Sequence, residues 1–291
     1  MPESTLLSAS RWLLGHEAPV RASAFGALLV VMAVWEVLAP RRALAFSRLR
    51  RWASNLGIVV LNSVLVRLVF PLAAVALAGL AQERGWGLLN QYQVPFVAAV
   101  LASVVALDLA IYLQHVMFHA LPVLWRLHRV HHADPDYDVT TGVRFHPIEI
   151  VLSMLIKLAA VVLLGPPAAA VMIFEVLLNA TAMFNHANVR LPAPLDRMLR
   201  VLIVTPDMHR VHHSMEDHET NSNFGFNLSV WDRLFRTYKA QPDAGHERMN
   251  IGIRNFRDPR LVSDLPGMLA LPFLGGDLGY AINQRHGAPD S

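Results

Sequence analysis

Four apolar stretches constrain most strongly what this chain can fold into. They cover about residues 22–39, 55–81, 95–120 and 149–186, and a helix needs roughly 20 apolar residues to cross a bilayer. The last stretch is interrupted by Gly165-Pro166-Pro167. Because proline removes a backbone donor and clashes with the preceding turn, we expect two short helices in a hairpin there. The sequence therefore predicts an all-α integral membrane protein.

The bulk composition agrees with a membrane protein. Of the 291 residues, 54% are hydrophobic and 16% are charged, and the mean hydropathy is +0.38. Soluble domains carry about a quarter charged residues. The lack of cysteine excludes disulfides, thiolate zinc sites and iron–sulfur clusters. No basic–aromatic run typical of a nucleic-acid surface is present, and the N-terminus lacks the marks of a cleaved signal peptide, so we expect the first apolar stretch to be retained.

The distribution of arginine predicts the orientation in the membrane. The segment after the first stretch, RRALAFSRLRRW, is strongly basic, and so is the chain after Asn188. The segment between the second and third stretches, QERGWGLLNQYQ, holds one arginine and one glutamate. Because positively charged loops stay on the cytoplasmic side, we expect the first loop, residues 121–148 and the tail on that side. The membrane would be a bacterial inner membrane, or the ER membrane in a eukaryote.

Ionisable residues inside the apolar stretches are expected to pair, because an isolated charge is unfavourable in hydrocarbon. Arg67 and Asp108 lie at matching depth in the antiparallel second and third stretches, and Lys157 and Glu175 do so across the proline hairpin. We therefore expect two structural ion pairs.

Histidines are concentrated just after the third stretch and again about seventy residues later. HVMFH ends the third stretch, and the motif H-x-x-H-H then occurs twice, in WRLHRVHHADPD and in PDMHRVHHSMED. Residues i and i+4 lie on one face of a helix, so both imidazoles of such a pair can reach one ion. Thr205 and Pro206 are typical of a helix start before the second copy. The eight clustered histidines are His115, His119, His128, His131, His132, His209, His212 and His213.

Eight clustered imidazoles predict a metal centre. Neutral imidazole suits iron, zinc and copper, and one ion takes roughly four to six ligands, so eight to ten histidines indicate two ions. Two ions can share the electrons for splitting dioxygen. Because zinc has no redox chemistry, iron is the better candidate if the reaction is an oxidation.

Two further histidines are candidate ligands. His146 lies in RFHPIE, and His186 lies in MFNHANVR on the same helix face as Glu175 and Asn179. The other four histidines have no such neighbours. Metal-bound imidazoles usually donate their outer N–H to an acceptor, and three carboxylates could accept here, unless they serve only as helix caps or surface groups: Asp134, Glu149 and Asp207.

The order of the motifs resembles a known family. HVMFH, HRVHH, RFHP, NHANV and MHRVHH, followed by NFGFNLSVWDRLFRTY, are similar to the fatty acid hydroxylase/sterol desaturase superfamily over roughly residues 95–240. The resemblance implies about four membrane helices with a short re-entrant-type hairpin, and a cytosolic histidine-bearing helical cap over a di-iron site. It also implies O2-dependent hydroxylation or desaturation of a lipid.

By motif position, the resemblance gives metal-ligand roles to the eight clustered histidines and to His146 and His186. Fatty acid 2-hydroxylases carry a further histidine four residues before the His186 position, where this chain has Ala182. His146 is then the substitute, as in sterol-desaturase-like members. Trp231 and Phe235, at i and i+4, are expected to pack around the cap by burying aromatic area.

The expected function is hydroxylation of an unactivated C–H bond in a membrane lipid, with O2 as co-substrate and two iron ions as cofactor. Desaturation on the same site is an alternative, as is a metal-stabilised lipid-binding protein without turnover. A divalent-metal transporter is a third candidate, for which the Gly-Pro-Pro break argues. Transporters hold ions near the bilayer midplane, whereas most of these histidines follow the ends of the apolar stretches. The motifs leave sterol, fatty acyl, sphingoid, alkylglycerol and carotenoid chains open as substrates.

Electrons are expected from an external donor of the ferredoxin or reductase type, because the chain has no GxGxxG fingerprint and no cysteine cluster. Arginines of the tail would attract an acidic donor or contact anionic lipid headgroups, and we take the headgroups as the default. These arginines are Arg190, Arg197, Arg200, Arg233 and Arg236.

We expect three regions along the chain. Residues 1–94 hold N-terminal membrane helices and the basic loop, residues 95–240 form the catalytic domain, and residues 241–291 form a tail. The tail contains an apolar stretch near 261–281, which either lies in the membrane interface or covers the domain.

Overall fold

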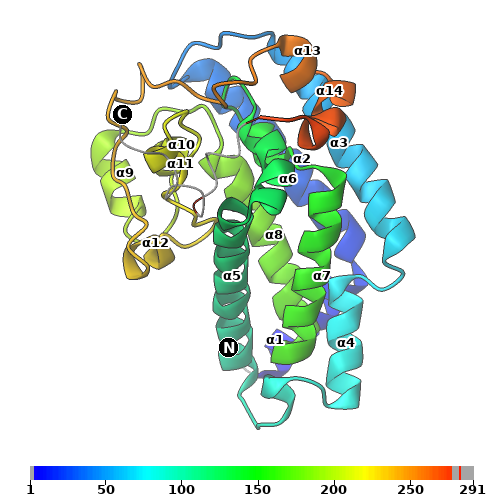
Figure 1. The fold of residues 1–291 in the computed structure, drawn as a ribbon. Helices are drawn as coiled ribbons and strands as arrows, with labels where there is room; N and C mark the ends of the chain where they lie inside the picture. The colour runs from blue at the N-terminus through cyan, green and yellow to red at the C-terminus, as the bar shows by residue number, and fades with distance from the viewer. Residues whose placement is uncertain (1–2, 277–281, 283–291) are drawn as a thin grey trace.

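The computed structural model describes residues 3–276 and residue 282 (Figure 1). Over these residues it contains helices and isolated bridges but no β-strand, which confirms the all-α class. The helices are α1 Glu3–Gly15, α2 Glu17–Leu38, α3 Arg48–Val69, α4 Ala74–Arg84, α5 Phe96–Ala120, α6 Pro122–His132, α7 Pro147–Leu164, α8 Ala168–Asn185, α9 Ala193–Leu199, α10 Pro206–His212, α11 Asp217–Thr220, α12 Val230–Leu234, α13 Pro259–Val262 and α14 Leu265–Ala270, with short 3-10 turns η1 Leu88–Asn90, η2 Thr141–Val143 and η3 Leu271–Phe273.

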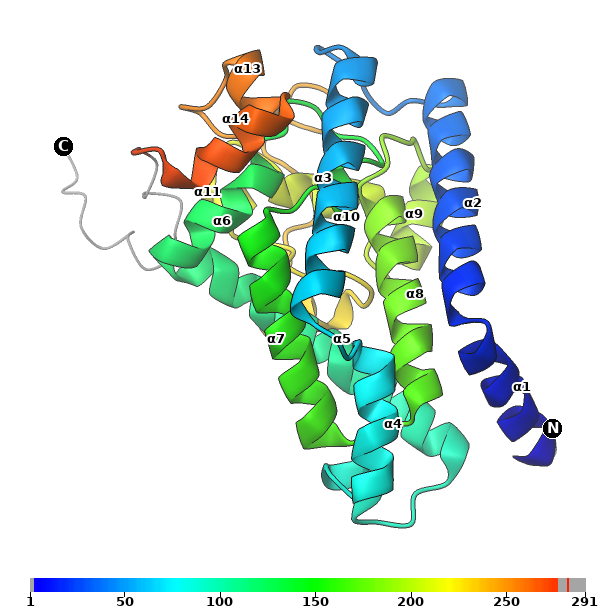
Figure 2. The same ribbon diagram turned by 90° about the vertical axis from the view of Figure 1, so that its right-hand side faces the viewer.

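Five segments of the described chain are long and apolar enough to cross a membrane. In Figures 1 and 2 they form a bundle, with α1 and α4 at one end and α6, α10 and α13 at the other. The protein is therefore a multi-pass membrane protein. The segments are Glu17–Leu38, Arg48–Asn90, Phe96–Ala120, Pro147–Leu164 and Ala168–Asn185.

The second apolar stretch is not one continuous helix. α3 ends at Val69 and α4 begins at Ala74, with Pro71 between them. Proline disfavours helical geometry at the residue before it and cannot donate the next backbone hydrogen bond. The break shifts α4 sideways, so that it packs against α7 and α8.

The proline hairpin is confirmed. α7 and α8 are joined by Gly165-Pro166-Pro167, and each helix has 18 residues, long enough by length and composition to cross a membrane. Gly165 ends α7 with a left-handed backbone (φ 66°), which glycine adopts without a steric penalty.

One of the two expected ion pairs inside the bundle is present. Lys157 Nζ lies 2.6 Å from Glu175 Oε1, and Arg21 of α2 contacts the other oxygen of the same carboxylate at 2.6 Å. The Arg67–Asp108 pair is wrong. Asp108 instead accepts hydrogen bonds from Trp231 Nε1 at 2.8 Å and from the backbone of residue 228, while Arg67 is exposed and makes no ion pair among the described residues.

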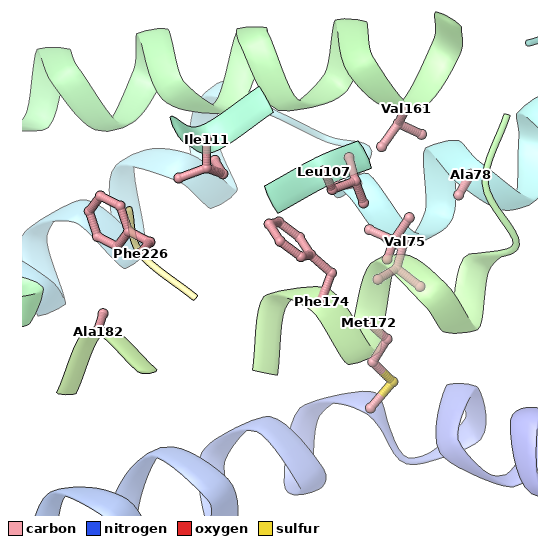
Figure 3. Packing of buried hydrophobic residues seen from close by; sticks show 11 residues of the cluster. Val75, Ala78, Leu107, Ile111, Val161, Met172, Phe174, Ala182 and Phe226 are labelled. Atoms are coloured by element: carbon pink, nitrogen blue, oxygen red, sulfur yellow. The ribbon is translucent and has the colours of Figure 1, made fainter. Parts of the chain in front are cut away.

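A cluster of buried apolar side chains fills the space between α4, α5, α7 and α8 (Figure 3). It includes Val75 and Ala78 of α4, Leu107 of α5 and Phe174 of α8, and Phe226 also belongs to it. Lipid tails are as apolar as these side chains, so within a bilayer the cluster stabilises the bundle through close packing rather than through removal from water.

The apolar stretch near 261–281 covers the domain over its described part. Met268 and Leu271 pack with Trp125 of α6 and Ile58 of α3 in one buried cluster. η3 packs against α6 and α14 packs against α3, and Figure 1 shows α13 and α14 near the upper end of α3. Residues 277–281 of that stretch lie outside the described residues.

A buried ion network ties the start of α3 to the loop after α6. Arg51, whose side chain is fully buried, contacts Asp134 at 2.6 Å and Asp138 at 2.5 Å. The same loop is held to Asn55 by a hydrogen bond to Thr140 at 2.9 Å. The network fixes the chain directly after the first H-x-x-H-H motif.

Arg51→Leu is expected to destabilise the protein by about 3–5 kcal/mol, because removing one partner leaves buried carboxylates without a counter-charge. Arg50→Leu is the matched control. Its guanidinium forms an exposed pair with Asp264, so its loss should change stability little. Denaturant unfolding in detergent micelles measures both variants, and equal effects would contradict the structural role of the network.

Candidate metal centre

Nine of the ten histidines expected from the sequence converge in two groups. Within each group every residue offers a nitrogen within 4.8 Å of the others, and all nine side chains are buried. We call these the five-histidine group and the four-histidine group. The first consists of His115, His119, His128, His132 and His212, and the second of His131, His186, His209 and His213.

Most of the five-histidine group comes from α5 and α6, which meet at a sharp turn. α5 ends at Ala120 and α6 begins at Pro122, which occupies the first helical position. Proline disfavours the helical conformation at Leu121, so the chain turns there. The i, i+4 pair of α5 then faces the i, i+4 pair of α6, with both Nε2–Nε2 distances near 3 Å: His115–His128 at 3.1 Å and His119–His132 at 3.2 Å.

The two H-x-x-H-H motifs serve the two groups in opposite ways. In the first copy the outer pair enters the five-histidine group and the middle residue, His131, enters the four-histidine group. In the second copy the outer pair enters the four-histidine group and the middle residue, His212, enters the five-histidine group. Each short helix therefore links both groups, because its i+3 and i+4 side chains diverge around the helix axis.

The Arg-Val pair between the histidines anchors each short helix from its outer side. Val130 and Val211 are fully buried. Arg129 donates to the carbonyl of Leu271 at 2.6 Å and lies over the ring of Phe256. Arg210 contacts Asp207 and lies over the ring of Tyr137.

The start of α10 follows the sequence prediction. Thr205 is the N-cap and its hydroxyl accepts from the backbone of Met208, with Pro206 at the first helical position. His186 enters from the C-terminal end of α8, where its Nδ1 donates to the carbonyl of Ala182 at 2.7 Å.

Outward hydrogen bonds fix the orientation of several imidazoles. The Nδ1 of His115 lies 2.7 Å from the carbonyl of Phe224, and that of His212 lies 2.7 Å from the carbonyl of Ser222. A carbonyl only accepts, so each Nδ1 carries the proton and each Nε2 presents its lone pair inward. The Nδ1 of His128 lies 2.6 Å from Glu149 Oε1. Of the three carboxylates considered in the sequence, Glu149 is the one that contacts an imidazole of the two groups in the described chain.

The geometry of the Nε2 atoms fits a cation in each group. His186 Nε2 lies 3.1 Å from His131 Nε2, 3.2 Å from His213 Nε2 and 3.1 Å from His209 Nε2. It has one lone pair, so at most one of these contacts is a hydrogen bond. His212 Nε2 is buried without a hydrogen-bond partner in the described chain. A positive ion between the nitrogens satisfies these lone pairs.

Burial keeps these imidazoles neutral, which is the form that binds metals. It lowers the pKa of His128 and of His186 to about 3. Burial, together with the neighbouring imidazoles, also holds the pKa of His131, His132, His209, His212 and His213 well below the ordinary value. Protons therefore do not compete with a metal ion near neutral pH.

His146 lies outside both groups. It is the N-cap of α7, where its Nδ1 accepts from the backbone N–H of Ile148 at 3.2 Å, and its Nε2 lies 3.3 Å from the carbonyl of Leu269. Because both ring nitrogens have other partners, we leave His146 out of the proposed ligand set. The outer-acceptor role is wrong for Asp134 and Asp207, which pair with Arg51 and Arg210.

Aromatic rings that the sequence did not single out enclose the histidines. Phe145 stacks on His131 with ring centroids 4.5 Å apart, Phe226 lies 5.0 Å from His115, and Tyr137 lies 5.1 Å from His213. Phe224 and Phe226 of the NFGF motif, and Phe145 directly before His146, can be read from the sequence. Nothing in the neighbouring sequence shows that these rings contact histidines of other helices.

Comparisons with known proteins place this site in a family. Residues 100–237 match the fatty acid hydroxylase family. An ornithine lipid hydroxylase of Rhizobium tropici is 30% identical over 151 residues, which are 52% of this chain and 44% of that protein. Human alkylglycerol monooxygenase is 27% identical over 144 residues, 48% of this chain and 30% of that protein. The alkylglycerol monooxygenase of Xenopus tropicalis is 30% identical over 140 residues, 47% of this chain and 29% of that protein.

The match over residues 100–237 and the similarity to lipid hydroxylases confirm the family resemblance seen in the ordered motifs. The chain spans less than half the length of these curated relatives. No solved structure matches it at a significant level.

Gly142→Ala is expected to disturb the four-histidine group. A Cβ at Gly142 would lie 2.5 Å from the carbonyl oxygen of Ala182 and 3.1 Å from His186 Nδ1, so it would break the bond that orients this imidazole. Loss of such a bond weakens metal binding by about 10–100-fold. Competition titration of metal-free protein with Co²⁺ measures the change, and Gly79→Ala, which meets no atom within 4 Å, is the control. Unchanged affinity in Gly142→Ala would argue against this orienting role.

Glu149→Gln keeps the shape of the side chain but replaces the carboxyl group that faces His128 with an amide. We expect the five-histidine group to bind Co²⁺ about 10–100-fold more weakly, because the carboxylate raises the basicity of the imidazole that it accepts from. The same titration reports the loss, and Glu247→Gln, at a side chain 66% exposed, should have no effect. Equal affinities in the two variants would show that Glu149 has no influence on the site.

Proposed function

We propose that this chain is a di-iron, O2-dependent hydroxylase of a membrane lipid. The observation that carries the proposal is the pair of buried histidine groups, whose Nε2 atoms face one another at 3.1–3.2 Å. The ornithine lipid hydroxylase and the alkylglycerol monooxygenases that this chain resembles support the reaction class. The absence of cysteine leaves imidazole as the dominant donor set, which suits iron.

The nine histidines would hold the ions, as five ligands on one side and four on the other. When bound, a pair of iron ions supplies the redox chemistry that reduces dioxygen and oxidises a C–H bond. In the balanced reaction, one oxygen atom enters the C–H bond and the other leaves as water, with two electrons and two protons delivered from outside.

The residues of the chain orient and shield this chemistry. The backbone carbonyls of Phe224, Ser222 and Ala182, together with Glu149, hold four imidazoles in place from outside. A ligand set oriented in advance does not have to reorganise during the reaction. The surrounding rings and the apolar cluster that contains Phe226 exclude water, which protects a reactive oxidant from side reactions.

The substrate would approach from the membrane. Phe226 belongs both to the ring contacts of His115 and to the apolar cluster that continues between α5 and α8 (Figure 3). Because these surroundings are apolar, they suit the hydrocarbon chain of a lipid substrate. The donor would deliver electrons at the histidine end, which we place on the cytoplasmic side from the arginine distribution.

Hydroxylation is preferred over desaturation because the relatives are hydroxylases and monooxygenases by name. Transport of a divalent metal is less well supported. The histidines gather at the ends of α5 and α8 and on the short helices beyond them, rather than along the middle of the bundle where transporters hold ions.

The decisive experiment compares lipid extracts from cells with and without the protein by mass spectrometry. A species heavier by one oxygen supports hydroxylation. A species lighter by two hydrogens identifies a desaturase, and unchanged lipids together with metal uptake into cells would support a transporter.

His212→Ala is expected to abolish oxygen uptake and to reduce the iron content, because its Nε2 faces the other members of the five-histidine group. His16→Ala is the control, since His16 is exposed and its Nδ1 contacts the carbonyl of Trp12 at 2.8 Å. His146→Ala should retain iron, because His146 lies outside both groups. Metal analysis of the purified proteins measures all three, and loss of iron in His146→Ala would restore His146 to the ligand set.

A further inference from the structure

An exposed apolar surface lies beside α5 rather than beyond its end. It is formed by α9, the turn after α9, and α12, and its members are 40–66% exposed. Figure 1 shows α12 beside the upper part of α5, with α9 above α12. We call this surface the interfacial patch, and it consists of Met198, Val201, Leu202, Val230, Leu234 and Phe235.

Two contacts fix the depth of the α12 side of the patch along α5. Phe235 stacks on Tyr112 with ring centroids 5.3 Å apart, and Trp231 donates to Asp108 at 2.8 Å. At ~1.5 Å per residue, Tyr112 and Asp108 lie about 12 and 18 Å along the axis from Ala120, the last residue of α5.

This depth lies below the membrane surface. α5 has 25 residues and is about 37 Å long, against a hydrocarbon thickness of about 30 Å. A helix that spans the hydrocarbon therefore extends beyond it by only about 7 Å in total. The level of Tyr112 is then within the hydrocarbon, even when all of the excess lies at the histidine end. Side chains beside it must meet lipid or another protein.

The patch is suited to lipid. The backbone of its two segments is hydrogen-bonded across them, with Ser229 N donating to Leu202 O at 3.0 Å and Val204 N donating to Asn227 O at 3.0 Å. Within hydrocarbon, backbone polar groups have to be satisfied inside the protein, as these groups are. The neighbouring surface of α5 is also apolar and exposed at Leu113, as expected of a lipid-facing helix.

Arginines flank the patch where headgroups would lie. Arg197 directly precedes Met198 and Arg236 directly follows Phe235, and both arginines are exposed. Long basic side chains beside apolar ones are typical of surfaces that rest in the membrane interface. Arg200, expected from the sequence to lie at the surface, is instead buried against Asp196 and the carbonyl of Ala240.

We propose that the interfacial patch is immersed in the lipid bilayer, on the side that carries the histidines, with Arg197 and Arg236 at the level of the lipid phosphates. The segment from Phe226 to Phe235 then runs from the histidines to the lipid chains. Immersion of the patch holds the metal-binding helices at the depth of the membrane instead of above it.

The experiment uses the absence of cysteine from the chain, which makes single-site labelling selective. Leu202→Cys and Leu234→Cys carry an environment-sensitive fluorophore in the full-length protein, reconstituted into vesicles of phosphatidylcholine and phosphatidylglycerol. Arg254→Cys, at a side chain 62% exposed before α13, is the control. Each label is quenched in turn by lipids brominated on their acyl chains and by aqueous iodide.

Immersion predicts that brominated lipids remove most of the fluorescence at positions 202 and 234, while iodide removes little. The label at 254 should respond in the opposite way. Strong iodide quenching at both patch positions would overturn the proposal, since the patch would then face water. Protection from both quenchers would also overturn it, because a second copy or a partner protein would cover the patch.

Discussion

The structure depends on holding nine imidazoles with ring nitrogens turned toward one another in a dry interior. Such an arrangement is repulsive unless a cation lies between the nitrogens, so the fold has to supply the constraint from outside. Backbone carbonyls do so for His115, His186 and His212, and the carboxylate of Glu149 does so for His128. The protein therefore prepares the proposed metal site through atoms that would not touch the metal.

The pair of H-x-x-H-H motifs explains how one short sequence pattern can serve two ions. A single copy of the motif places two imidazoles on one face of its helix and the third on the adjacent face. Two copies that face each other complement one another, and α5 and His186 add the remaining ligands unequally. The resulting groups of five and four differ in their outer partners as well. Three histidines of the smaller group have a buried Nδ1 without a hydrogen-bond partner in the described chain, so the two ions would sit in different electrostatic surroundings.

Charged side chains inside the bundle serve structure rather than chemistry. Glu175 is compensated by both Lys157 and Arg21, which joins α2 to the proline hairpin. Arg51 is compensated by two carboxylates of the loop after α6, Asp134 and Asp138, and this pairing fixes the loop against α3. Each network links a membrane helix to a segment that carries or follows a histidine, so a change in the packing of the bundle would also displace the histidine groups.

The sequence by itself determined the donor chemistry, the helical spacing of the histidines, the proline hairpin and the Lys157–Glu175 pair, because these follow from residue type and from local geometry. The tertiary structure decided which histidine enters which group, that His146 caps α7 and lies outside both groups, and that Asp108 binds Trp231 instead of Arg67. Spacing along a helix fixes the face on which a side chain lies. It does not fix which other helix that face meets, and this depends on corners such as Leu121-Pro122 and on contacts between residues more than a hundred positions apart.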